Sequence, residues 1–154
     1  MERTFPWSYA RLARYSLTVI PAAPLSQSVP VSERVTKVGE GLWLVRFPTV
    51  EDVTVEYSKP VVPVLAEACR TGPILLMAHL PPDLRLVPAG MAPFWLNAFL
   101  LGGVRVKGIG VTSTSRAVKV VLAGVEAAMK VRGQPIPAKS FPTLEELIAW
   151  GKSF

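Results

Sequence analysis

Two nearly continuous apolar runs constrain the fold of this chain more than any other feature. They read LWLVRF at residues 42–47 and ILLMAHL at 74–80, and a third run, VRVKGIGVT at 104–112, alternates only partly. A strand that is covered on both faces lacks regular alternation, and such strands are typical of parallel sheets. Helix-like segments separate the runs. The sequence therefore predicts an α/β fold with a mainly parallel sheet and helices on both faces.

The expected order of elements is β-β-α-β-α-β-α-β-α, with one antiparallel edge strand. The first two strands, 34–38 and 42–47, flank Gly39-Glu40-Gly41, which is a β-hairpin signal. The remaining expected elements are strands at 74–80, 104–112 and 135–141, and helices at 61–70, 89–101, 116–132 and 143–150. The last strand is bounded by prolines, which favours a sheet edge. Thr143 and Glu146 have the spacing of a capping box for the final helix.

The first 32 residues differ from the rest and are interpreted as an N-terminal arm. They hold four prolines and one acidic residue, and helical character is expected at 8–17 at most. The arm lacks the periodicity of a sheet, so residues 33–154 are expected to fold as a domain without it.

Composition narrows the function of this 154-residue chain. It has one histidine, His79, and one cysteine, Cys69, which excludes multi-histidine metal sites, cysteine-rich zinc modules and intramolecular disulfides. We therefore expect no catalytic residue, no metal and no cofactor. The net charge is +6, but lysines and arginines are scattered singly rather than interleaved with aromatic residues. This distribution argues against a nucleic-acid partner.

Residues 86–104 are a candidate membrane span, because none of these 19 positions carries a charge. Prolines at 88 and 93 and glycines at 90, 102 and 103 would break a continuous helix. The stretch is interpreted as a loop, a short helix and a turn. The N-terminus does not read as a secretory signal, so a cytoplasmic location is expected.

From about residue 33 to its end, the chain resembles the STAS-like domains related to anti-sigma-factor antagonists. The matching segments are GLWLVRFP, GPILLMAHL, VRVKGIGVTSTSRAVKVVLAGV and SFPTLEELIAW. The similarity is to the SpoIIAA-like branch, which is akin to CRAL-TRIO lipid-binding domains. It implies a compact α/β module that binds a protein and sometimes a small or lipidic ligand.

The chain departs from that family at two functional positions. Phosphorylated members carry a serine where the helix after the central strand begins, but here that helix begins Pro88-Ala89-Gly90-Met91. The phosphorylation switch therefore cannot be transferred to this chain. The acidic residue that closes the preceding strand in the family corresponds here to His79.

Polar residues are expected at the carboxyl edge of the sheet, where open α/β sheets bind ligands. His79 closes one strand, and Thr112, Ser113, Thr114 and Ser115 follow another. This edge is a candidate site for an anion or another ligand at a helix N-terminus. The alternatives are that the hydroxyls cap the helix and that loop backbone satisfies His79.

The helix expected at 89–101 is apolar all round, with Asn97 as its polar side chain. The arm or the loop at 81–88 would cover its outer face, or else that face is exposed for a partner, a second copy or a lipid. The candidate interaction residues are Phe94, Trp95, Leu96, Phe99 and Leu100. We expect a non-enzymatic regulatory protein that self-associates through this helix. The alternative is a carrier or sensor of an apolar ligand or lipid that uses the helix as a lid, with possible contact to a membrane surface.

Overall fold

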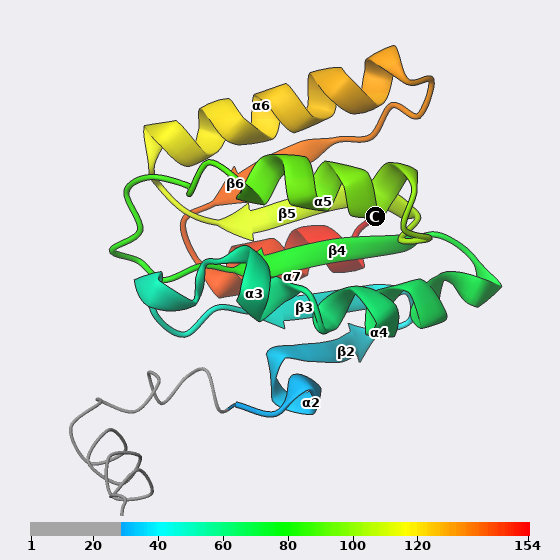
Figure 1. Ribbon diagram of the computed structural model, residues 1–154, viewed down its shortest axis with the longest axis horizontal. Helices are drawn as coiled ribbons and strands as arrows, with labels where there is room; N and C mark the ends of the chain where they lie inside the picture. Colours follow the sequence, from blue (N-terminus) through cyan, green and yellow to red (C-terminus); the bar gives the residue numbers. More distant parts are fainter. Residues whose placement is uncertain (1–28) are drawn as a thin grey trace, which may run out of the picture.

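A computed structural model describes residues 29–154, and Figure 1 shows their arrangement. The first 28 residues, including the helix expected at 8–17, lie outside the described part. Five strands form one sheet in the order β2-β3-β4-β5-β6. Their bounds are Val35–Gly39, Leu42–Arg46, Ile74–His79, Val106–Thr112 and Ala138–Phe141. Strand β2 pairs antiparallel with β3 and the other pairs are parallel, which confirms the expected α/β class.

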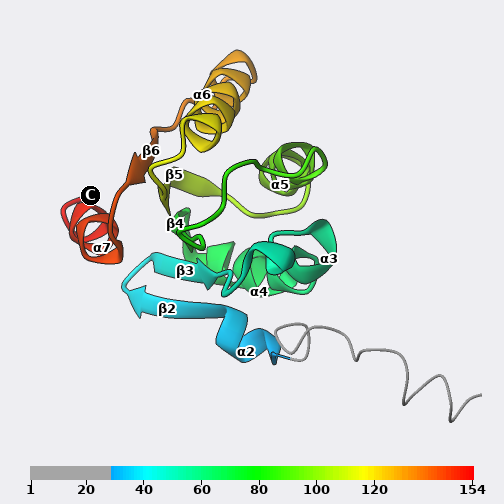
Figure 2. The same cartoon turned by 90° about the vertical axis from the view of Figure 1, so that its left-hand side faces the viewer.

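The helices cover both faces of the sheet, as Figure 2 shows. Helices α4 (Val61–Ala68), α5 (Met91–Leu100) and α6 (Arg116–Val131) lie on one face. Successive right-handed crossovers in one direction keep connecting helices on the same face. Helix α7 (Leu144–Lys152) follows the last strand and covers the other face. None of the helices within residues 29–154 is long and apolar enough to cross a membrane.

Several short elements were not expected from the sequence. They are helices α2 (Val31–Arg34) and α3 (Val55–Ser58) and two 3-10 helices, Val50–Asp52 and Cys69–Thr71. Elements of three or four residues are too short to show a hydrophobic period. The boundary expected after residue 32 lies inside α2, and β2 begins at Val35 rather than at residue 34.

The last strand is shorter than the expected range of 135–141. It begins at Ala138 because Pro135 and Pro137 have no backbone N–H to donate to a neighbouring strand. Strand β6 does lie at a sheet edge, as predicted. Thr143 caps α7 as expected, since its hydroxyl accepts a hydrogen bond from the Glu146 N–H at 3.1 Å.

Glycines bring α7 into close contact with the sheet. An added Cβ at Gly110 would lie 2.5 Å from Leu147 Cδ1 and 2.8 Å from Trp150 Cζ3. A Cβ at Gly108 would lie 3.0 Å from Phe154 Cζ, and one at Gly151 would lie 3.1 Å from the sulfur of Met77. The absence of side chains at these positions therefore sets the short distance between α7 and strands β4 and β5.

We expect Gly110→Ala to lower the free energy of unfolding by about 1–3 kcal/mol, because the new methyl group overpacks the contact with α7. Urea denaturation measures the change. Gly124→Ala on α6 is the matched control, since no atom in the described part of the chain lies within 4 Å of its added Cβ. That control should raise stability by about 0.5–1 kcal/mol. A Gly110→Ala protein as stable as wild type would contradict this account of the α7 contact.

Candidate functional site

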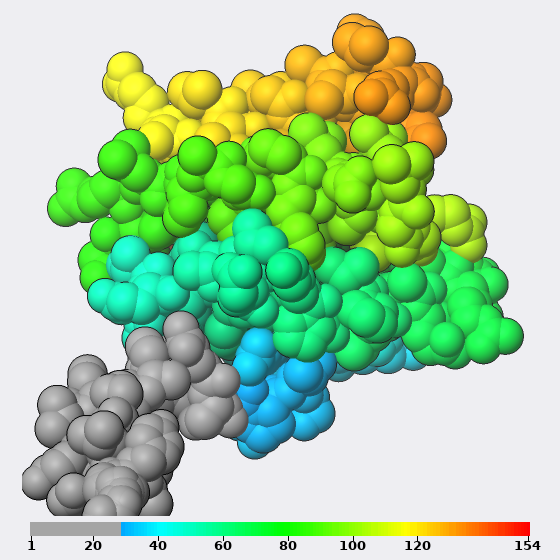
Figure 3. Space-filling view, in the orientation of Figure 1, coloured from blue at the N-terminus to red at the C-terminus, as the bar shows by residue number. Residues whose placement is uncertain are grey.

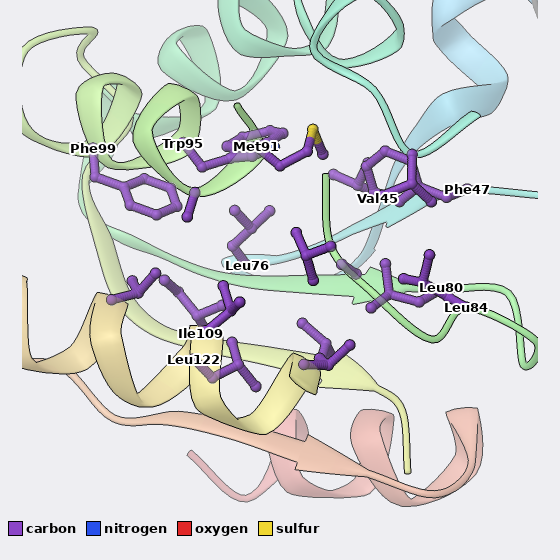
Figure 4. Close-up of a pocket in the computed structure, with 18 residues that line it drawn as sticks. Val45, Phe47, Leu76, Leu80, Leu84, Met91, Trp95, Phe99, Ile109 and Leu122 are labelled. Carbon is purple, nitrogen blue, oxygen red and sulfur yellow. The ribbon is translucent and has the colours of Figure 1, made fainter. Parts of the chain in front are cut away.

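An apolar cavity of about 120 Å³ lies between the sheet and helices α5 and α6 (Figure 4). Strands β3, β4 and β5 form its floor, with Val45, Leu76 and Ile109 pointing into it. The loop before α5 contributes Leu80 and Leu84 at one end. The side chains of residues 29–154 that line the cavity are all apolar, and none of them is titratable.

Helix α5 forms the roof of the cavity through residues spaced four apart. Met91, Trp95 and Phe99 point from α5 toward the sheet (Figure 4). The rings of Trp95 and Phe99 lie 5.9 Å apart at an angle of 36°. Tilted ring pairs of this kind are favourable beyond the area they bury. The large rings fill the space beneath α5 incompletely, and the cavity is what remains.

Helix α6 supplies the second wall. Val118, Leu122 and Val125 line the cavity and are buried. They belong to the apolar stripe that the 3.6-residue period predicts, opposite a stripe with Arg116, Lys119 and Lys130. Ser115 caps this helix, because its hydroxyl accepts a hydrogen bond from the Val118 N–H at 3.3 Å.

The five predicted interaction residues on α5 do not share one surface. Phe99 is buried and Trp95 lines the cavity, whereas Phe94, Leu96 and Leu100 are half-buried. The outermost ridge carries three other residues, Pro93, Asn97 and Leu101. The loop at 81–88 lines the cavity through Leu84 and Val87 rather than covering this ridge.

The strand register brings the predicted polar edge together. Arg46, His79 and Thr112 lie side by side at the carboxyl ends of β3, β4 and β5. Thr112 Oγ1 accepts a hydrogen bond from the Leu80 N–H at 2.9 Å and donates to the Leu80 carbonyl at 3.3 Å. This hydroxyl therefore connects two strands and has protein partners for both roles.

The serines that follow Thr112 serve the local backbone. Ser113 Oγ accepts a hydrogen bond from the Ser115 N–H at 3.0 Å, and Ser115 Oγ donates to the Arg85 carbonyl at 2.9 Å. Thr114 is exposed. Helix capping, one of the two readings that the sequence left open for these hydroxyls, holds for Ser115, while Thr112 and Ser113 bond to nearby loop backbone.

At the carboxyl edge of the sheet, the structure lowers the pKa of His79. Burial, followed by the positive charge of Arg46, lowers the pKa of His79 below its ordinary 6.5. Its Nδ1 is buried and has no hydrogen-bond partner within residues 29–154, while its carbonyl accepts from the Phe47 N–H at 3.0 Å.

A buried polar cluster beside β3 was missed by sequence reasoning. The Arg34 guanidinium lies 4.4 Å from the centroid of the Tyr57 ring and donates to the Tyr57 carbonyl at 3.0 Å. Asp52 is fully buried, and its Oδ2 accepts from the Thr49 N–H and hydroxyl. Burial, and then the charge of Asp52, raises the pKa of Tyr57. The cluster joins residues distant in sequence, which a local pattern cannot reveal.

No family model, curated protein or solved structure matches this chain. Within residues 29–154, no group of histidine, cysteine, aspartate and glutamate side chains is arranged to hold a metal ion.

The pKa of His79 predicts how stability depends on pH. The folded protein disfavours the protonated imidazole, so the unfolded chain binds this proton more readily. Stability is full above the unfolded pKa of about 6.5 and falls as the pH drops through the window below it. Urea denaturation at pH 7.5, 6.5 and 5.5 should show a falling free energy of unfolding. His79→Gln should remove that slope, and a slope unchanged in this variant would show that His79 is not its source.

Proposed function

We propose that this protein binds a small, uncharged apolar molecule in the cavity beneath α5. The observation that carries the proposal is the lining, which is apolar on the sheet, on both helices and on the loop. A charged or strongly polar ligand would lose its hydration there without gaining hydrogen bonds. An apolar ligand would instead gain contacts that the unfilled space does not provide.

The size of the cavity limits the class of ligand. Its volume of about 120 Å³ is near that of an engineered apolar cavity of about 150 Å³ that stays dry and binds benzene. A single ring or a short branched hydrocarbon segment matches this volume. A longer chain would require α5 to move away from the sheet.

Helix α5 is the element suited to admit such a ligand. It connects to the sheet through the loop at 80–90 on one side and through Gly102 and Gly103 on the other. Gly103 has a φ of 83°, a conformation that side-chain-bearing residues rarely adopt. We infer that α5 acts as a lid over the cavity.

The proposed activity is binding rather than catalysis, because the lining offers no nucleophile, acid or base. The STAS-like resemblance implies binding of a protein and sometimes of a small or lipidic ligand, and the proposal corresponds to the second of these. Self-association through α5 stays a prediction, which light scattering coupled to gel filtration measures directly. Leu101, which follows the last residue of α5 and is 80% exposed, is an apolar side chain that a second copy could contact.

Benzene is the probe for the cavity. At a hundred times its Kd, a ligand stabilises the native state by about 2.7 kcal/mol. For a chain of this size we expect benzene to raise the Tm by about 5–10 °C. Differential scanning calorimetry of the full chain, with and without benzene, measures the shift.

Filling the cavity should abolish the effect of benzene. Ala78→Leu on β4 and, as a second variant, Ala92→Leu on α5 place a larger side chain in the space. Ala149→Leu on the exposed side of α7 is the matched control and should keep the full shift. No shift in wild type, or an equal shift in folded Ala78→Leu and Ala92→Leu proteins, would overturn the proposal.

A further inference from the structure

Large exposed apolar side chains of residues 29–154 gather around α5 and α6. Val131 is 83% exposed, Val120 65% and Leu101 80%, and Leu86 in the loop before α5 is 72% exposed. The fifth, Phe154, lies apart at the end of α7, where Lys107 Nζ is 5.9 Å from its ring centroid. Clusters of this kind mark surfaces that meet another apolar body.

Helix α6 has an uncharged outer sector separate from its buried stripe. Val120, Gly124, Ala127 and Val131 are exposed and follow one another at helical spacing. No atom of residues 29–154 lies within 4 Å of a Cβ added at Gly124, so the described part of the chain leaves this sector open. A solvent-facing sector of a helix ordinarily carries polar residues. The sector therefore breaks the pattern that the rest of α6 follows.

Helix α5 extends the uncharged surface. Its outer ridge of Pro93, Asn97 and Leu101 is exposed, and no residue of α5 is charged. Helices α5 and α6 lie side by side in Figure 3. The bond from Ser115 Oγ to the Arg85 carbonyl ties the loop that carries Leu86 to the start of α6. We call Leu86, Leu101, Val120, Gly124 and Val131 the α5/α6 surface.

Positive charge flanks the α5/α6 surface. Helix α6 and the residue after it carry four basic side chains, Arg116, Lys119, Lys130 and Arg132, against one acidic side chain, Glu126. Glu126 is held toward β6, since it accepts a hydrogen bond from the Ala138 N–H at 3.1 Å. Within residues 29–154, none of the four basic side chains forms an ion pair.

Near helices α3 and α4, on the same face of the sheet, basic side chains are paired with acidic ones. There Glu56 pairs with Lys59 at 3.7 Å and Glu67 pairs with Arg70 at 2.9 Å. Their charges are balanced locally, whereas those of α6 are not. The unbalanced charge therefore coincides with the exposed apolar residues.

We propose that the α5/α6 surface docks on a membrane that contains anionic lipids. Its apolar side chains enter the boundary between headgroups and acyl chains, and the basic side chains of α6 contact the lipid phosphates. A second copy fits this surface less well, because pairing through α6 would bring two basic stripes together. The proposal concerns the outer surface and holds whether or not the inner cavity binds a ligand.

Sedimentation with vesicles tests the docking surface. Full-length protein should bind vesicles of phosphatidylcholine with about a third phosphatidylserine, bind pure phosphatidylcholine far more weakly, and detach as salt rises. Val120→Gln with Val131→Gln should weaken binding about tenfold or more, because the exposed valines no longer bury apolar area. Arg116→Gln with Lys119→Gln should weaken it about fivefold for each charge removed.

Matched controls separate this surface from general stickiness. Phe154→Gln removes an exposed apolar side chain, and Lys139→Gln with Lys152→Gln removes two exposed charges, all on elements other than α6. At low salt, Phe154→Gln should bind vesicles within about twofold of wild type. Lys139→Gln with Lys152→Gln should lose less binding than Arg116→Gln with Lys119→Gln. Equal losses in the α6 variants and the controls, or no binding to anionic vesicles, would overturn the proposal. A wild-type dimer that Val120→Gln with Val131→Gln makes monomeric, without vesicle binding, would instead assign the surface to a second copy.

Discussion

The fold depends on burying strand β4 on both of its faces. Ile74, Leu75, Leu76 and Met77 are four successive buried residues at the centre of the sheet. Successive strand residues point to opposite faces, so each face needs its own cover. Helix α7 covers Leu75 and Met77, and the larger layer with α4, α5 and α6 covers Ile74 and Leu76.

The two covers fit the sheet differently, and that difference creates the candidate site. Toward α7 the sheet presents Gly108 and Gly110, so the helix approaches to contact distance. On the face toward α5, the sheet carries branched side chains such as Ile109 and Val111, and the side chains of Trp95 and Phe99 on α5 face them. Large rings above large aliphatic side chains leave space that neither layer fills. Protein interiors are normally close-packed, so space of this kind is suited to a ligand.

The strands and long helices were predictable because their patterns are long and their apolar runs are unambiguous. The carboxyl edge was also predictable, since parallel strands end together, and the register places His79 beside Thr112. The orientation of α5 could not be predicted, because a helix without a polar stripe does not indicate which of its sides faces the core. The structure buries Phe99 and leaves Leu101 outside, although both are large and apolar. The cavity itself depends on how layers fit across the chain, which no local pattern contains.

Xenon binding tests the central claim, an open apolar space beneath α5, most directly. Xenon enters dry apolar cavities without needing hydrogen bonds. A crystal of the full chain placed under xenon pressure should show density bounded by Leu76, Trp95 and Leu122, with little movement of α5. A structure in which α5 has closed onto the sheet, with no xenon between them, would contradict the account.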